Sequence, residues 1–163
     1  MIFDYGYSPY FFRKLRLMRR SKFNVDYDTN KRTYDGIVFD SVTEMKYYRD
    51  VVCPMVESGD IVSCKLQVPY ELQPKFVHDN KTVRAIVYVA DFVITYKDGS
   101  IQVIDIKGCP DSVAKLKRKL FWFNYPEIDY RWIKYVKKYG GWIEYEEYEK
   151  IKRDEKRGKT YEL

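Results

Sequence analysis

The chain has 163 residues, 45% of them hydrophobic, and a formal net charge of +6. This size fits one domain with its own core, and three cysteines without a C-x-x-C pair argue against a disulfide framework or a zinc finger. No apolar run approaches the roughly 18 residues of a membrane span, and the N-terminus does not resemble a secretory signal. We therefore expect a cytoplasmic protein without a membrane partner.

Charge is divided unevenly along the chain. Residues 1–34 contain eight Lys and Arg against three acids, and residues 115–138 contain eight against two, whereas residues 35–114 contain eight against twelve. Basic flanks around an acidic centre suit a protein that attracts a polyanion and holds a divalent cation, although ordinary solvated charge is the simpler explanation of the charge pattern alone. We expect residues 1–34 to form a basic arm or helix and residues 35–163 to form a single domain with a C-terminal helix.

The first half of that domain predicts a helix and three strands. Residues 41–52, "SVTEMKYYRDVV", have helical periodicity with Ser41 as N-cap, and Pro54 should end or kink this helix. Residues 60–72 are rich in β-formers but contain Pro69, which favours a strand near an edge of the sheet. Residues 83–96 and 101–108 give the strongest strand signals and should form a hairpin.

The second half predicts a helix, a strand and another helix. Residues 111–123, "DSVAKLKRKLFWF", indicate a helix capped by Asp111 or Ser112. Residues 130–136, "YRWIKYV", indicate a strand, and the charged residues 142–157 indicate the C-terminal helix.

The loop of the hairpin decides which residues face each other. A two-residue "DG" loop would put Asp91 and Asp105 on opposite faces of the sheet. A three-residue loop of residues 97–99, with Gly99 left-handed, pairs Tyr96 with Ser100 and puts Asp91 opposite Asp105. The residues expected on one face are then Val89, Asp91, Val93, Thr95, Ile101, Val103, Asp105 and Lys107. Both faces of this hairpin are largely apolar, so we expect both to be covered.

Two carboxylates placed across a strand pair repel each other and need compensation. Lys107 can neutralise one charge, and Mg²⁺ or Mn²⁺, which prefers hard oxygen ligands, can neutralise the pair. The alternative is a buried Asp–Lys pair whose second aspartate is protonated or solvated. Glu44 also has two possible interpretations. It fits a capping box with Ser41, or it is a third metal ligand that its helix places close to the two aspartates.

The ordered set of motifs resembles the PD-(D/E)xK nuclease superfamily. The segments "YDGIVFDSVTEMKYY", "GDIVSCKLQVPYEL", "YVADFVITY", "VIDIKG" and "KLKRKLFWF" are similar to phage-encoded nucleases of the Holliday junction resolvase type, from about Ser21 to about Trp132. The resemblance implies an α/β (α+β) fold with a restriction-endonuclease-like core, in which a central mixed sheet flanked by helices carries the metal site on a β-hairpin. One departure is Ala90, where the family often has proline.

The resemblance also implies roles for single residues. Asp91 and Asp105 would hold one or two Mg²⁺ or Mn²⁺ ions with the backbone carbonyl of Ile106, and Glu44 would be a further ligand, directly or through water. Lys107 would orient the attacking water or stabilise the transition state. Gln67 would lie beside the metal, although a satisfied amide on an edge strand is an equally good explanation. No small-molecule cofactor is implied.

The function implied is metal-dependent cleavage of branched DNA, such as a four-way junction, by a homodimer in the cytoplasm of a bacterial host. A duplex nuclease of the same fold, restriction-like or acting at transposon ends, and a non-catalytic DNA-binding module are the alternatives. The N-terminal basic segment could instead form a dimerisation helix or a membrane-surface helix. The basic residues expected to bind DNA are Arg13, Lys14, Arg16, Arg19, Arg20, Lys22, Lys115, Lys117, Arg118 and Lys119.

Overall fold

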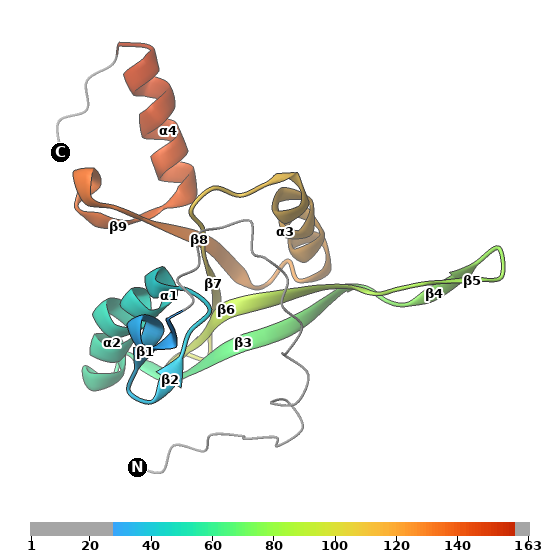
Figure 1. The fold of residues 1–163 in the computed structure, drawn as a ribbon, viewed down its shortest axis with the longest axis horizontal. Coiled ribbons are helices and arrows are strands. Elements are labelled where there is room, and N and C mark those ends of the chain that lie inside the picture. Colours follow the sequence, from blue (N-terminus) through green and yellow to red (C-terminus); the bar gives the residue numbers. More distant parts are fainter. Residues whose placement is uncertain (1–27, 159–163) are drawn as a thin grey trace.

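A five-stranded mixed sheet forms the centre of the protein, with helices on both sides of it (Figure 1). The computed structural model describes residues 28–158. The strand order is β3-β6-β7-β8-β9, in which β7 and β8 are parallel and the other neighbours are antiparallel. The expected class, a mixed α+β fold with a central sheet flanked by helices, is therefore confirmed. The sheet strands are β3 (Ile61–Gln73), β6 (Ile86–Tyr96), β7 (Ile101–Ile106), β8 (Asp129–Val136) and β9 (Gly141–Glu144).

Shorter elements surround this sheet. Two small antiparallel pairs lie outside it, one formed by β1 and β2 and one by β4 and β5. Their bounds are Thr33–Tyr34 for β1, Ile37–Val38 for β2, Phe76–His78 for β4 and Lys81–Val83 for β5. The α-helices are α1 (Val42–Tyr47), α2 (Cys53–Glu57), α3 (Ser112–Asn124) and α4 (Tyr145–Lys156), and the other helical turns are η2 (Thr29–Arg32), η3 (Tyr48–Val52) and η4 (Lys137–Tyr139).

The hairpin of β6 and β7 has the three-residue loop expected from the sequence. Tyr96 N donates to Ser100 O at 2.9 Å, and Gly99 N donates to Tyr96 O at 3.0 Å. Gly99 has a φ of 84°, in the left-handed region that glycine occupies without a steric penalty. The ladder then runs from Thr95 opposite Ile101 to Phe92 opposite Ile104, so the predicted register is confirmed.

Two hydrophobic clusters cover the two faces of this hairpin. Because adjacent residues of a strand point to opposite faces, Ile94 and Val93 mark the two sides. Ile94 belongs to a cluster with Met45 and Tyr47 of α1, whereas Val93 belongs to a cluster with Phe121 of α3. The expectation that both faces of the hairpin are covered is therefore confirmed.

The faces exchange at one point along β3 and β6. Leu66 and Phe92 lie in the α1 cluster, but two positions away Val68 and Ala90 lie in the α3 cluster. Gln67, between them on β3, has a φ of 52°, so a residue with a left-handed backbone lies at the point of exchange.

One sequence prediction fails because of this exchange. We expected Val89 on the face of Val93, whereas Val89 is 44% exposed and its neighbours Tyr88 and Ala90 are buried in the cluster of Val93.

The helix that begins after Ser41 does not end at Pro54. It passes from α1 into the π-helical turn η3 and then into α2, with Pro54 in the first turn of α2. Proline has no amide hydrogen to donate, and the regular α-helical bonding pattern is already interrupted by the π-helical turn η3 directly before α2. The change of helix type just before Pro54 places Val52, which is fully buried, against the sheet.

β3 is an edge strand, as Pro69 predicted, and it continues with β6 beyond the sheet. In Figure 1 the pair leads into a thin ribbon that projects from the body and ends in β4 and β5. Asp79 and Asn80 form its tip, both with positive φ, a conformation that these two residue types tolerate better than most.

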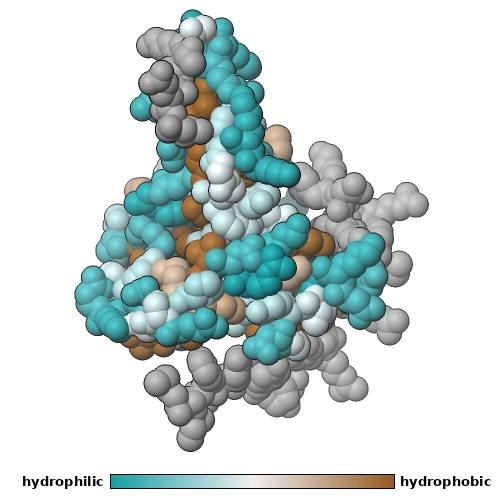
Figure 2. Space-filling view, turned by 90° about the vertical axis from the view of Figure 1, so that its left-hand side faces the viewer, coloured by the Kyte–Doolittle hydropathy of each residue, from teal (hydrophilic) through white to brown (hydrophobic). Residues whose placement is uncertain are grey.

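The C-terminal prediction is wrong at its start. Residues 141–144 form β9 rather than the first turn of a helix, and Tyr135 pairs with Trp142. Gly140 and Gly141, with φ of 84° and 118°, make the tight turn that returns the chain along β8. α4 then leaves the body with a mainly hydrophilic surface and hydrophobic patches near its base (Figure 2). Within residues 28–158, no helix is long and apolar enough to cross a membrane.

Replacement of Gly99 tests how much the hairpin depends on its loop. A Cβ at Gly99 would meet no described atom within 4 Å, so Gly99→Ala pays only for the left-handed backbone, roughly 1–2 kcal/mol of unfolding free energy in urea titrations. Gly108→Ala is the matched control, because its Cβ also meets open space and its φ is ordinary. Equal stability of the two variants would contradict the role assigned to the loop.

Candidate active site

Asp91 and Asp105 lie side by side where the ladder between β6 and β7 ends. One step beyond the pair of Phe92 and Ile104, the register sets Asp91 across from Asp105. There Asp91 Oδ2 accepts a hydrogen bond from Ile106 N at 2.7 Å. The carboxylate of Asp91 is thereby fixed beside the strand that carries Asp105. This amide is separate from the carbonyl of Ile106, and the role as a metal ligand that the resemblance implies for the carbonyl stays a prediction.

Asp105 is buried and held by two side chains. It is 2% exposed, and its Oδ2 lies 2.8 Å from Lys107 Nζ. The same oxygen accepts a hydrogen bond from the Tyr130 hydroxyl at 3.1 Å, and this hydroxyl accepts one from Trp132 Nε1 at 2.7 Å. The Lys107 side chain is 28% exposed. The buried carboxylate is therefore paired with a side chain that solvent can reach.

Glu44 contacts its N-cap residue Ser41 and also has a buried carboxylate oxygen without a partner among the described residues. Its backbone N–H donates to Ser41 Oγ at 3.1 Å, which caps α1, and Ser41 Oγ donates to Glu44 Oε1 at 2.7 Å. Glu44 is only 8% exposed, and its Oε2 is buried with no hydrogen-bond partner among the described residues. A buried carboxylate oxygen without a partner costs free energy unless a proton or a cation meets it.

Glu44 and Asp91 both have raised pKa values. Burial raises the pKa of the Glu44 carboxyl from 4.5 to about 7, and the negative charges of Asp40 and Asp105 add to this against the opposing hydrogen bond from Ser41. Burial also raises the pKa of Asp91 well above its usual range, with repulsion from Asp105 and Glu44 as further causes. The field of each carboxylate thus reaches the others, and this is the arrangement that a divalent cation relieves.

The carboxylate oxygens of the site are the type of ligand that a hard cation prefers, but their side chains are not arranged in a complete coordination shell. Among the described residues, no three His, Cys, Asp or Glu side chains converge closely enough to hold an ion. The unpartnered Oε2 of Glu44 and the raised pKa values of Glu44 and Asp91 are nevertheless what carboxylates awaiting Mg²⁺ or Mn²⁺ have in common. The residues that could hold such an ion are the three acids expected from the sequence, Glu44, Asp91 and Asp105.

Gln67 occupies the position across from Asp91 on β3. It lies between Leu66, which pairs with Phe92, and Val68, which pairs with Ala90. Its left-handed backbone costs roughly 1 kcal/mol for a residue other than glycine, and such strain is concentrated at functional sites. The structure therefore puts the backbone of Gln67 next to the acids.

The basic residues of α3 divide into different environments. Lys115 and Lys119 are exposed, whereas Lys117 Nζ donates to Val87 O at 2.6 Å. Arg118 is 7% exposed and forms an ion pair with Glu146. The remaining expected DNA-binding residues, Arg13, Lys14, Arg16, Arg19, Arg20 and Lys22, lie outside the described residues.

Sequence reasoning missed Tyr130 and Trp132. Both are buried, and β8 brings them beside Asp105 because Asp105 is aligned with Trp132 in the parallel ladder. Their two-residue spacing in "YRWIKYV" indicates that they share one face of a strand. That signal could have grouped them, but it does not say which strand they accompany.

Comparison of the sequence with models of known protein families assigns the chain to one family. Residues 20–141 match a family model described as a protein of unknown function (DUF1064). Because the match spans most of the chain, the protein belongs to this family. No curated protein matches the sequence. The family description names no activity, so any inference about function depends on the chemistry of the acids and Lys107.

The raised pKa of Glu44 makes stability depend on pH. Between pH 4.5 and about 7 the folded protein keeps a proton on Glu44 that the unfolded chain has lost. The stabilisation of the folded state by this extra bound proton is complete below pH 4.5 and is lost as pH rises through 7. In EDTA, the unfolding free energy of the wild type relative to Glu44→Gln, which cannot titrate, should fall by up to about 3 kcal/mol from pH 4.5 to 8 in urea titrations. Parallel curves for the two proteins would contradict the buried, repelled state of Glu44.

Proposed function

We propose that the protein is a metal-dependent DNA endonuclease of the PD-(D/E)xK type that hydrolyses phosphodiester bonds in branched DNA, as Holliday junction resolvases do. The observation that carries the proposal is the position of Lys107 Nζ, 2.8 Å from the buried Asp105, with Asp91 fixed beside it by Ile106 N. Two carboxylates can hold a metal ion that activates water, and a lysine beside them can stabilise the charge that develops on the phosphate.

The metal-binding residues would be Asp91, Asp105 and Glu44, with Mg²⁺ or Mn²⁺ as the ion. When bound, the ion would lower the pKa of a water and stabilise charge on the phosphate. The chain's own residues prepare the site for this. Tyr130 and Lys107 both hold Oδ2 of Asp105, which sets the orientation of that carboxylate.

Lys107 would have the second role. It is the partly exposed end of the cluster, so its ammonium can meet a phosphate oxygen or a water molecule that arrives from outside. A fixed positive charge at this point favours the extra negative charge of the transition state more than the ground state.

Binding of DNA would come from the basic surface next to the acids. Lys115 and Lys119 are exposed on α3. This helix covers the face of the hairpin on which Val93 and Val103 lie. A polyanion held there would place its backbone close to Asp105 and Lys107, and its affinity would fall steeply with salt. The choice of branched DNA rests on the resemblance in sequence, and a homodimer is proposed on the same ground.

The test is cleavage of labelled DNA by the purified protein. A four-way junction, a fork and a linear duplex are each incubated with Mg²⁺, Mn²⁺ or EDTA. We expect cleavage with either metal, none in EDTA, and the fastest cutting of the junction. Equal rates on all three substrates would point to a duplex nuclease, and no cutting of any of them would favour a DNA-binding module without activity.

Variants at the site connect this activity to the residues. Asp105→Asn and Lys107→Ala should each lower the cleavage rate by about 100-fold or more while junction binding at low salt is kept. Lys65→Ala removes an exposed lysine from the edge strand and is the control, expected to cut like the wild type. Normal cutting by Asp105→Asn would place the active site elsewhere.

A further inference from the structure

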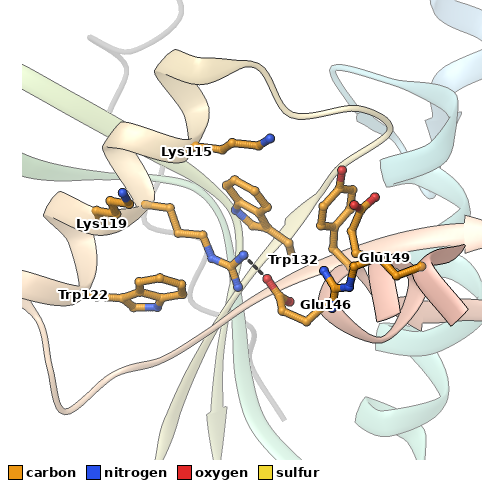
Figure 3. Close-up of a pocket in the computed structure, with 9 residues that line it drawn as sticks. Lys115, Lys119, Trp122, Trp132, Glu146 and Glu149 are labelled. Carbon is orange, nitrogen blue, oxygen red and sulfur yellow. Dashed lines mark hydrogen bonds and ion pairs between the residues drawn. The ribbon is translucent and has the colours of Figure 1, made fainter. Parts of the chain in front are cut away.

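A pocket of about 340 Å³ lies between α3 and α4, with β8 behind it. Four of its lining residues come from α3, one from β8 and four from α4. Figure 3 shows Lys115, Lys119 and Trp122 on the α3 side, Glu146 and Glu149 on the α4 side, and Trp132 between them. The volume is at the lower end of the range for small-ligand sites, which is enough for one nucleotide.

Arg118 makes this pocket a built site rather than a gap between helices. Its guanidinium carbon lies 4.4 Å from the ring centre of Trp122 and 4.2 Å from that of Trp132, and it pairs with Glu146. Arg118 is 7% exposed, yet its Nε has no hydrogen-bond partner among the described residues. A charged donor that is held so firmly and left partly unpaired indicates a missing acceptor.

The charges and rings around Arg118 indicate the chemical class of that ligand. The lining contains four cations, Arg118 among them, against two carboxylates, so it favours an anion. Arg118 lies over the ring of Trp122, but Trp122 is still 45% exposed, and its remaining aromatic surface is available for a base to stack on. Glu146 and Glu149 can accept hydrogen bonds from the amino and imino groups of a base. The ligand that fits this lining has a phosphate, a planar base and hydrogen-bond donors on that base, and these are the parts of a nucleotide.

The pocket is joined to the candidate active site through buried side chains. Trp132, in the wall of the pocket, donates to the Tyr130 hydroxyl at 2.7 Å, and Tyr130 donates to Asp105 at 3.1 Å. The pocket and the candidate active site are therefore separated by only two buried side chains, so one bound strand could contact both. A free nucleotide would need no such proximity.

We propose that this pocket binds one unpaired nucleotide of a single-stranded DNA segment. Its base stacks on Trp122, its phosphate lies against Lys115 and Lys119, and Arg118 supplies the buried contact. The identification of this strand as part of a cleaved substrate rests on the proposed nuclease function, whereas binding itself does not. Unpaired nucleotides occur where branched DNA opens, so the pocket would favour such DNA over a closed duplex.

The test measures binding in EDTA, where no cleavage takes place. Fluorescence anisotropy follows a labelled ten-residue oligothymidine, the same oligonucleotide with abasic sites, and a duplex of equal length. Trp122→Ala should weaken oligothymidine binding about tenfold, in keeping with the loss of one stacked base. Trp122→Phe should restore most of the affinity. Phe123→Ala is the matched control, because Phe123 is the next residue of α3, is 83% exposed and does not line the pocket.

The wild type should prefer oligothymidine to the abasic strand, and Trp122→Ala should lose this preference. Equal affinity of the wild type for the two strands, or unchanged binding by Trp122→Ala when its thermal unfolding is normal, would overturn the proposal. Free thymidine monophosphate is added as a competitor. Displacement of the strand at micromolar concentration would assign the pocket to free nucleotides instead. If binding follows these expectations but no DNA is ever cut, the nuclease function fails and the pocket stands.

Discussion

The repulsion between Asp91 and Asp105 is the constraint on which the rest of the site depends. Two carboxylates meet at a buried position of the sheet, and a third, that of Glu44, is close enough to add to the repulsion. Lys107 offsets part of it through its ion pair with Asp105, and the amide of Ile106 offsets part through its hydrogen bond to Asp91. The remaining cost appears as raised pKa values and an unpartnered oxygen, and a divalent cation would remove both.

Several separate parts of the fold hold the carboxylates of Asp91 and Asp105 close together despite their repulsion. The left-handed Gly99 sets the register that brings Asp91 to Asp105, and the left-handed Gln67 lies across from Asp91 on the neighbouring strand. Parallel pairing of β7 and β8 then supplies Tyr130 as a donor to Asp105. Because a packed sheet cannot relax around one residue, the acids stay together even though they repel.

Local signals were predictable from the sequence, whereas contacts between distant segments were not. Gly99 was predictable because a short loop between two strong strands has few allowed conformations. Gln67 was not assigned its left-handed backbone, since nothing in a glutamine favours it. Trp142 was placed in a helix because the helical period of the following residues extends back to it, while its strand depends on pairing with β8. The partners of Tyr130 and Arg118 come from elements that only the folded chain brings together.

Calorimetric titration with Mn²⁺ at pH 6.5, repeated in buffers of different ionisation enthalpy, tests directly whether the acids form a cation site. The wild type should bind one or two ions and release protons as it does so, because Glu44 and Asp91 have raised pKa values. Asp91→Asn should bind at least tenfold more weakly, and Asp79→Asn, at the exposed tip of the ribbon, should behave like the wild type. Binding without proton release, or binding that Asp91→Asn leaves unchanged, would contradict a metal site at these carboxylates.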